Sequence, residues 1–219
     1  MLLKKNYLSI KKIKTTHGFY TRLGGFSKNQ FKSLNCSITN GDNKTIVVKN
    51  KVSAMKNLNL QNKKLILINQ THSTKVVRIN KTNLNKNLKA DGMITSLKNV
   101  VLGTLTADCA PIFIYDDTSK YVCNLHSGWK GTLNNISQKA INLFDKYNIK
   151  RSNLIAVIGP CLGVSNYEVD KDFEKRFINK NIKYSKFFKY KNNFKSYFNI
   201  RGLINYQLSE LGVKKIYNI

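Results

Sequence analysis

Short apolar runs of strand length recur along the chain, separated by polar turns and by longer amphipathic segments. Runs rich in Ile, Val and Leu predict buried strands at 65–69, 75–79, 99–106, 110–115, 121–125 and 153–158. Apolar residues at helical spacing predict helices over 44–60, 132–147, 172–177 and 200–211, followed by a strand at 214–219. Since strands and helices do not alternate strictly, the pattern argues against a doubly wound sheet.

Other segments carry a weaker pattern. Residues 1–16 alternate apolar side chains with Lys and predict an edge strand or two, ahead of a short strand at 17–22. Asp116 and Asp117 predict a hairpin turn, and the polar run at 80–89 predicts a surface loop. The aromatic, Lys-rich segment 182–198 has no clear period, so we expect either a loop that covers the site or plain surface.

Soft or borderline metal ligands stand at the ends of three apolar runs, namely His72, Cys109 and His126. Two His and one Cys with an open fourth position are typical of catalytic zinc sites, because a structural site closes the tetrahedron with a fourth protein ligand. Zinc in such a site lowers the pKa of bound water to about 7. Asp91 either orients a site residue or caps a turn, and the sequence leaves both readings open.

Two glycine-flanked loops are candidate anion sites. Arg22 precedes Gly24 and Gly25, where glycine lets the backbone approach a ligand closely; the competing interpretation is a plain turn. The second loop precedes the helix predicted from residue 132, whose N-terminus would present N–H groups to an anion. Its candidate residues for binding phosphate are Gly128, Lys130 and Gly131.

Length and composition indicate the general class of protein. The 219 residues, with 42% hydrophobic content and no internal shift of composition, predict one domain over 1–219 with a single core. No apolar run approaches the roughly 18 residues of a membrane span, and the run at the N-terminus is too short for a signal peptide. We therefore expect a soluble cytoplasmic protein with no membrane partner, whose four Cys are reduced thiols.

The formal charge of +27 comes mostly from evenly spread Lys, whereas Arg, which binds phosphate and guanine bidentately, occurs at five positions. A solvated surface explains this composition better than a nucleic-acid-binding face does, although the charge can steer anionic substrates. Three His are too few to fill several copper sites. This count argues against multicopper oxidase chemistry and makes copper a poorer candidate than zinc.

Seven motifs occur in the order typical of one bacterial family. They are HGFYTRLGG at 17–25, SLN at 33–35, NQTH at 69–72, ADGMIT at 90–95, TADCAP at 106–111, HSGWKG at 126–131 and IGPC at 158–161. In these motifs, and over nearly the whole chain, the sequence resembles the laccase-domain family. That family was once labelled polyphenol oxidase and is now regarded as purine nucleoside phosphorylases with adenosine deaminase activity.

The resemblance implies a cysteine-hydrolase-like α+β fold of mixed sheets flanked by helices, with the site at strand ends. It implies conversion of adenosine or inosine and inorganic phosphate to the base and ribose 1-phosphate, with guanosine and methylthioadenosine as further candidates. Adenosine deamination would be a second activity. Zinc would be held by His72, Cys109 and His126.

The resemblance also extends to the surroundings of the ligands. Asn35 would contribute to the substrate site, and Gln70 and Asp108 would orient the metal ligands or contact the substrate. Family members usually continue with a Cys-Thr element and a Phe-Ser-Tyr-Arg element beyond the last predicted strand, whereas this sequence stops at Ile219. Two alternatives are open: the sequence is a truncated piece of a longer chain, or the protein lacks that part of the family's pocket. The expected oligomeric state is a monomer.

Two other functions fit the same residues. In the first, Cys109 is a thiolate nucleophile with His126 as its base and no metal, which would give amide or ester hydrolysis. The family resemblance implies peptidoglycan precursors as the substrate of such a hydrolase. In the second, a Lys-rich protein associates with nucleic acid and its Cys/His cluster is structural. Metal content separates the two enzymes, and salt-dependent retention on nucleic acid tests the third possibility.

Overall fold

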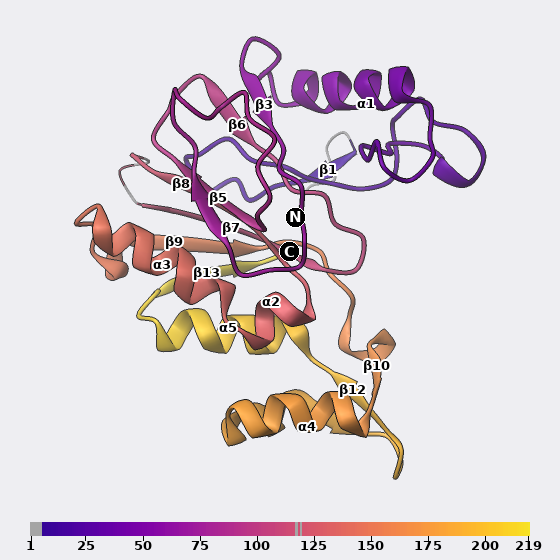
Figure 1. Ribbon diagram of the computed structural model, residues 1–219, viewed down its shortest axis with the longest axis vertical. Coiled ribbons are helices and arrows are strands. Elements are labelled where there is room, and N and C mark those ends of the chain that lie inside the picture. The colour runs from indigo at the N-terminus through magenta and orange to yellow at the C-terminus, as the bar shows by residue number, and fades with distance from the viewer. Residues whose placement is uncertain (1–5, 117, 119) are drawn as a thin grey trace.

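A six-stranded mixed sheet forms the centre of the computed structural model, which describes residues 6–116, 118 and 120–219 (Figure 1). The outer pairs of the sheet are parallel and the three inner pairs are antiparallel. In sheet order the strands are β13 (Lys215–Asn218), β9 (Leu154–Ile158), β7 (Ala110–Asp116), β8 (Val122–Ser127), β5 (Gly92–Thr95) and β4 (Val76–Arg78). The expected α+β fold with mixed sheets is confirmed.

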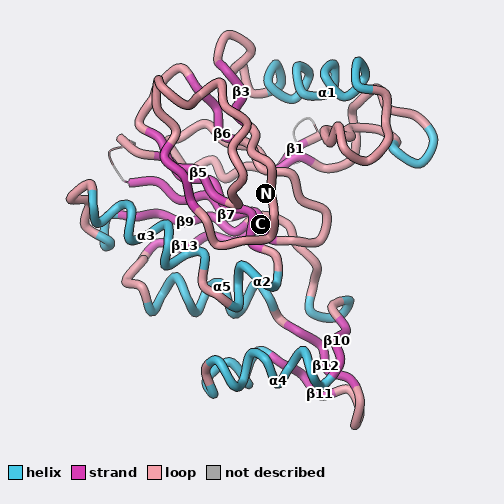
Figure 2. Tube along the Cα trace, in the orientation of Figure 1, coloured by secondary structure: helices cyan, strands magenta, loops and turns pink. Residues whose placement is uncertain are grey.

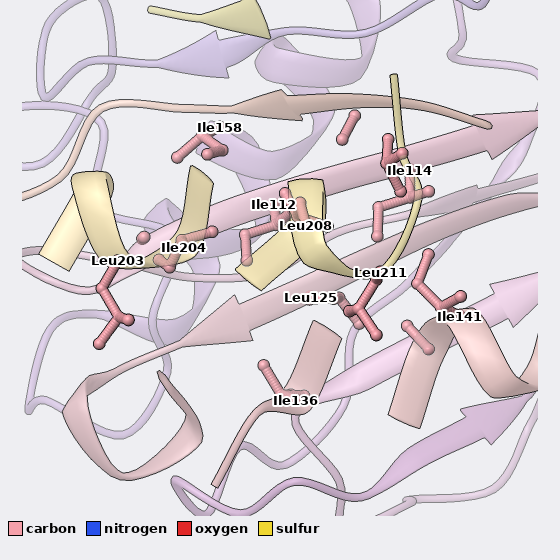
Figure 3. Packing of buried hydrophobic residues seen from close by; sticks show 14 of the residues in the cluster. Ile112, Ile114, Leu125, Ile136, Ile141, Ile158, Leu203, Ile204, Leu208 and Leu211 are labelled. Atoms are coloured by element: carbon pink, nitrogen blue, oxygen red, sulfur yellow. The ribbon is translucent and has the colours of Figure 1, made fainter. Parts of the chain in front are cut away.

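Three helices cover one face of this sheet, α2 (Trp129–Leu133), α3 (Ile136–Lys146) and α5 (Ile200–Glu210) (Figure 1). Figure 3 shows the core between them, where side chains of β7 and β8 meet those of α3 and α5. Ile112, Leu125 and Leu208 are fully buried there. Burial of apolar area at roughly 25 cal/mol per Å² makes this layer the main source of stability.

A smaller layer lies against the other face and is built mostly from the N-terminal half (Figure 1). It contains two two-stranded sheets: β1 (Tyr7–Leu8) pairs antiparallel with β2 (Phe19–Tyr20), and β3 (Lys64–Ile66) pairs parallel with β6 (Val100–Leu102). The helical elements are η1 (Asn29–Phe31) and α1 (Lys44–Asn57). The edge strand expected within 1–16 is therefore β1, and residues 1–5 of that prediction lie outside the described part.

A third unit follows β9 and extends away from the central sheet (Figure 2). The short helix η2 (Arg151–Asn153) precedes β9, and η3 (Val164–Asn166) follows β9 and leads to this unit. Its elements are β10 (Glu168–Asp170), α4 (Lys171–Lys180), η4 (Ile182–Phe187), β11 (Phe188–Tyr190) and β12 (Lys195–Phe198). The strands form an antiparallel sheet in the order β10–β12–β11.

This third unit corrects the expectation for 182–198. The segment is not a loop over the site, because it folds into η4 and a hairpin, but most of its side chains are exposed, in line with the surface alternative. Phe198 of β12 and Phe177 of α4 are fully buried with ring centroids 4.8 Å apart, whereas Tyr190 and Phe194 are exposed. Each strand is only three or four residues long, which is too short to show a period in the sequence.

The prediction of one continuous helix over 132–147 is wrong, because the structure has two helices there, α2 and α3. Asn135 stands at the break in the left-handed conformation, with φ 54°, and its side chain accepts a hydrogen bond from the Gln138 N–H. An Asn that caps a helix in this way favours a new helix start over continuation. At the predicted hairpin turn, Asp116 accepts a hydrogen bond from the Tyr121 N–H, and Asp117 lies outside the described residues.

No helix in the described ranges is both long enough and apolar enough to span a membrane. All four cysteines are free thiols, in agreement with the expected reduced state.

Replacing Phe144 by Ala should lower the free energy of unfolding by about 3–5 kcal/mol, because the change removes a fully buried ring and leaves a cavity beneath α3. The same substitution at Phe194, which is 78% exposed, should change it by less than about 0.5 kcal/mol. Urea unfolding followed by circular dichroism measures both effects. Equal losses in the two variants would contradict the packing of α3 on the sheet.

Candidate metal centre and active site

Three elements bring His72, Cys109 and His126 together, as the sequence predicted. Their candidate ligand atoms all lie within 4.8 Å of one another. The Cys109 Sγ is 3.9 Å from the His72 Nε2, and the two imidazole rings meet edge to face with centroids 4.8 Å apart. His72 is exposed, Cys109 is half-buried and His126 is buried, so one side of the cluster faces solvent.

The hairpin of β7 and β8 places two of these residues. His126 lies opposite Pro111 and Ser127 opposite Ala110, so Cys109, immediately before β7, lies beside the end of β8. The strand predicted over 99–106 does not deliver Cys109, because β6 ends at Leu102 and the next strand begins at Ala110. The start of one hairpin strand always adjoins the end of the other, and this brings Cys109 and His126 together.

A buried carboxylate, Asp91, orients the two histidines. Its Oδ1 accepts hydrogen bonds from the His126 Nδ1–H at 2.8 Å and from the His72 backbone N–H at 3.0 Å. Its Oδ2 accepts hydrogen bonds from the Ser73 backbone N–H at 2.6 Å and from the Ser73 hydroxyl at 2.7 Å. Of the two roles left open for Asp91, the structure therefore shows the orienting one.

His72 itself adopts a left-handed backbone conformation with φ 56°. Few residues other than glycine adopt this conformation without a compensating interaction, although His does so more often than most. The hydrogen bonds from the backbone N–H groups of Thr71, His72 and Ser73 to Asp91 supply that compensation.

The protonation states follow from these contacts. Burial by itself raises the pKa of Asp91, but hydrogen bonds from His126 and Ser73 outweigh it and hold that pKa below its usual value. Burial lowers the pKa of His126 despite the neighbouring carboxylate. Neutral His126 thus has its proton on Nδ1 and a lone pair on Nε2, which is the form that binds a metal.

The thiol of Cys109 is in a different electrostatic situation. Burial raises its pKa, and the negative charges of Asp108 and Asp91 raise it further. Cysteines that act as nucleophiles without a metal usually have a lowered pKa instead. A cation beside Cys109 would favour the thiolate, because it would offset those negative charges.

The donor set fits a zinc ion. Zinc bonds of about 2.0–2.1 Å to nitrogen and 2.3 Å to sulfur place the donors of a tetrahedral site about 3.3–3.6 Å apart. The 3.9 Å between the Cys109 Sγ and the His72 Nε2 is close to that range, and the donor atoms, which lie within 4.8 Å of one another, would draw together on the ion. Each donor atom comes from a different segment, and Asp91 supplies the carboxylate that usually supports a metal-bound histidine.

Gly128 lets the backbone pass close to the cluster. A Cβ at this position would lie 2.9 Å from the Cys109 Sγ and 3.0 Å from the His72 Cδ2. The sequence suggested Gly128, Lys130 and Gly131 as a phosphate loop before a long helix, but the helix that begins here has only five residues. Lys130 is exposed with its Nζ 5.4 Å from the centre of the Trp129 ring, and Gly131 is buried.

The other predicted neighbours of the ligands have different positions. The Gln70 side chain bonds to the backbone of Leu105, donating from Nε2 and accepting at Oε1, both at 2.8 Å. This pair ties the His72 loop to the segment before Cys109. Asp108 is exposed, and its backbone carbonyl accepts a hydrogen bond from the Leu162 N–H. Asp91 stands in the motif ADGMIT, so the sequence identified it as a candidate, but the sequence could not distinguish an orienting role from a turn cap.

A cavity of about 1120 Å³ adjoins the cluster. Its walls come from the N-terminal layer and from the face of β7 and β8 opposite the helices, with Phe19 and Phe113 among the apolar residues. The three candidate ligands are not part of its wall, but Ala107 and Pro111, on either side of Cys109, are. The cavity therefore reaches the strand end at which the cluster lies.

Arg22 and Asn35 line this cavity, whereas the two predicted glycines have a structural role. The Arg22 guanidinium donates from Nε and Nη2 to the Lys32 carbonyl at 3.0 and 2.7 Å. Gly24 has φ 83°, and a Cβ at Gly25 would lie 2.3 Å from the backbone oxygen of Ser33. The glycine pair thus allows the 22–33 loop to fold onto itself.

The family model described as multi-copper polyphenol oxidoreductase laccase matches residues 16–219. The chain belongs to this family. The crystal structure of Neisseria meningitidis protein NMB0706 has the same fold, with a TM-score of 0.86 at 25% identity, covering 98% of this chain and 87% of that one. YlmD from Geobacillus stearothermophilus gives a TM-score of 0.83 at 25% identity, covering 92% and 79%.

Curated relatives in this family carry the name purine nucleoside phosphorylase. One from Rickettsia conorii is 35% identical over 181 residues, which are 82% of this chain and 73% of the relative. YlmD of Bacillus subtilis is 36% identical over 164 residues, which are 70% of this chain and 58% of the relative. The matched region thus covers less than two thirds of the length of YlmD. Family membership inferred from the sequence motifs is confirmed.

Replacing Asp91 by Asn should weaken zinc binding about 10- to 100-fold, because an amide cannot accept hydrogen bonds at both of the positions that now orient His126 and the His72 loop. Asp116→Asn is the matched control, since Asp116 is also a buried carboxylate bound by backbone N–H groups but lies away from the cluster. Competition with a chromophoric zinc chelator measures the affinities. Equal weakening in both variants would contradict the role of Asp91.

Replacing Gly128 by Ala should weaken zinc binding at least tenfold, because the added methyl group would displace Cys109 or His72. Gly163→Ala is the control: both glycines have extended backbone conformations, and a Cβ at Gly163 meets nothing within 4 Å. The same chelator competition applies. Unchanged affinity in Gly128→Ala would rule out the close approach described above.

Proposed function

We propose that this protein is a zinc-dependent purine nucleoside phosphorylase that also deaminates adenosine. The observation that supports it most strongly is the hydrogen bond from His126 Nδ1 to Asp91, which directs the Nε2 lone pair toward His72 and Cys109 beside a cavity large enough for a nucleoside. The names of the family's curated relatives support the same activity.

In this reaction, a phosphate oxygen forms a bond to C1′ of the ribose while the bond from C1′ to the purine nitrogen breaks. The apolar wall around Phe19 and Phe113 would hold the base and exclude water. Arg22 uses Nε and Nη2 to bind Lys32, so that Nη1 can donate to phosphate, and Asn35 lies in the same wall. These side chains would fix the two substrates in line.

The metal would be held by His72, Cys109 and His126. When bound, it would supply a Lewis acid and acidify water, chemistry that suits both phosphorolysis and loss of ammonia from purine C6. Asp91 would hold the proton of His126 on Nδ1, which leaves Nε2 for the metal, and would keep the His72 loop in place.

A metal-free cysteine hydrolase is the second candidate, and one observation favours it. Cys109, His126 and Asp91 stand in the order of nucleophile, base and orienting acid, as in a catalytic triad. The raised pKa of Cys109 argues against this function, as does its closest imidazole, which belongs to His72 rather than His126.

Purified wild-type protein should contain about one zinc ion per chain and release adenine from adenosine only when phosphate is present. Cys109→Ser should lose both the metal and the turnover, because the hydroxyl is a poor zinc ligand. Cys161→Ser, a half-buried cysteine in a neighbouring loop, should retain both. Elemental mass spectrometry and product chromatography provide the measurements, and inosine would reveal the deaminase.

The outcomes separate the two enzymes. The hydrolase would be favoured over the phosphorylase if wild-type protein contained no metal, did not turn over nucleosides and was alkylated rapidly at Cys109. Zinc binding without nucleoside turnover would leave the metal centre in place and refute the proposed reaction.

A further inference from the structure

A second hollow, of about 540 Å³, lies between the start of β4 and helix α3. Its wall consists of residues 73–76 on one side and Lys139, Asn142, Leu143 and Lys146 of α3 on the other. The α3 residues follow the spacing of one helix face, so that they line the hollow along two turns. Its volume falls within the range of small-molecule sites, roughly 300–1000 Å³, but the hollow is open to solvent and its lysine side chains are exposed.

The charge on this wall is entirely positive. Lys75, Lys139 and Lys146 contribute three ammonium groups, and no carboxylate belongs to the wall. Within the described part of the chain, none of the three forms an ion pair. The one carboxylate of α3, Asp145, is bound instead by Arg151 at 2.7 Å. An anion bound in the hollow would be attracted by all three of these charges.

Neutral donors and an apolar floor complete the wall. Asn142 accepts a hydrogen bond at Oδ1 from Gln138 Nε2, which leaves its NH₂ group for a ligand, and Thr74 contributes a hydroxyl. Val76 and Leu143 are half-buried and line the hollow with apolar surface. Lys side chains are common phosphate binders, and three of them match a ligand with more than one negative charge.

We propose that this hollow binds a small molecule carrying two or more linked phosphates, such as pyrophosphate or a nucleoside diphosphate. The hollow begins at Ser73, the residue after His72, but the Ser73 hydroxyl is directed to Asp91 and none of the three candidate metal ligands belongs to the wall. The binding site therefore adjoins the metal centre and is separate from it, and it does not depend on the proposed phosphorylase activity.

Isothermal titration with pyrophosphate tests the proposal, with inorganic phosphate and adenosine as comparison ligands. Wild-type protein should bind one pyrophosphate per chain at the hollow and phosphate there at least tenfold more weakly. Adenosine, whose proposed site is the cavity beside the metal centre, should not displace pyrophosphate. The triple variant Lys75→Ala/Lys139→Ala/Lys146→Ala should bind pyrophosphate at least tenfold more weakly than wild type. Lys139→Glu is a second, less disruptive variant and should lose at least threefold.

The matched control is Lys180→Ala/Lys183→Ala/Lys189→Ala, which removes the same charge from exposed positions in the third unit. It should change the affinity by no more than twofold. Similar losses in both triple variants would show that binding depends only on the net charge of +27, and would overturn the proposal. Absence of saturable binding would also overturn it, and so would loss of binding in Cys109→Ser, which would assign the ligand to the metal centre.

Discussion

The carboxylate of Asp91 is the constraint on which the functional end of this molecule depends. It is fully buried, and an unpaired charge in that position would cost several kcal/mol. Both of its oxygens accept hydrogen bonds, from His126 and from the loop of residues 71–73. One side chain thus satisfies its own charge, fixes the tautomer of one histidine and holds the other in a left-handed backbone conformation.

The sheet gives this arrangement a rigid base. Alternate residues of β7 point to opposite faces, so that Ile112 and Ile114 enter the core beneath the helices while Phe113 faces the cavity. The strand that anchors Cys109 is therefore packed on one side and available to a ligand on the other. Because apolar burial is concentrated on the helix side, the opposite side can remain hollow without loss of the main core.

The family's description refers to several copper ions, but the histidines of this chain argue for a single centre. Two of the three belong to the cluster with Cys109. The third, His17, donates from Nδ1 to the Thr15 carbonyl and accepts at Nε2 from the Ile10 N–H, and burial lowers its pKa. Both of its nitrogens are thus occupied by the backbone, and its ring stacks on Phe113. A set of several copper sites would need more imidazoles than this.

The sequence by itself determined the class of fold, the family, the three residues of the cluster and the strands of the central sheet except β5, whose four residues follow Asp91 in a motif with no strand-length apolar run. Hydrophobic periodicity and motif order can be recognised in the sequence alone, because neither depends on how the elements pack. Only the tertiary structure showed that Asp91 orients the histidines, that Gln70 joins the His72 loop to the segment before Cys109, and that the backbone of Gly128 lies close to Cys109 and His72. Each of those contacts joins segments separated by at least 18 residues, so its existence depends on how strands and loops meet in space.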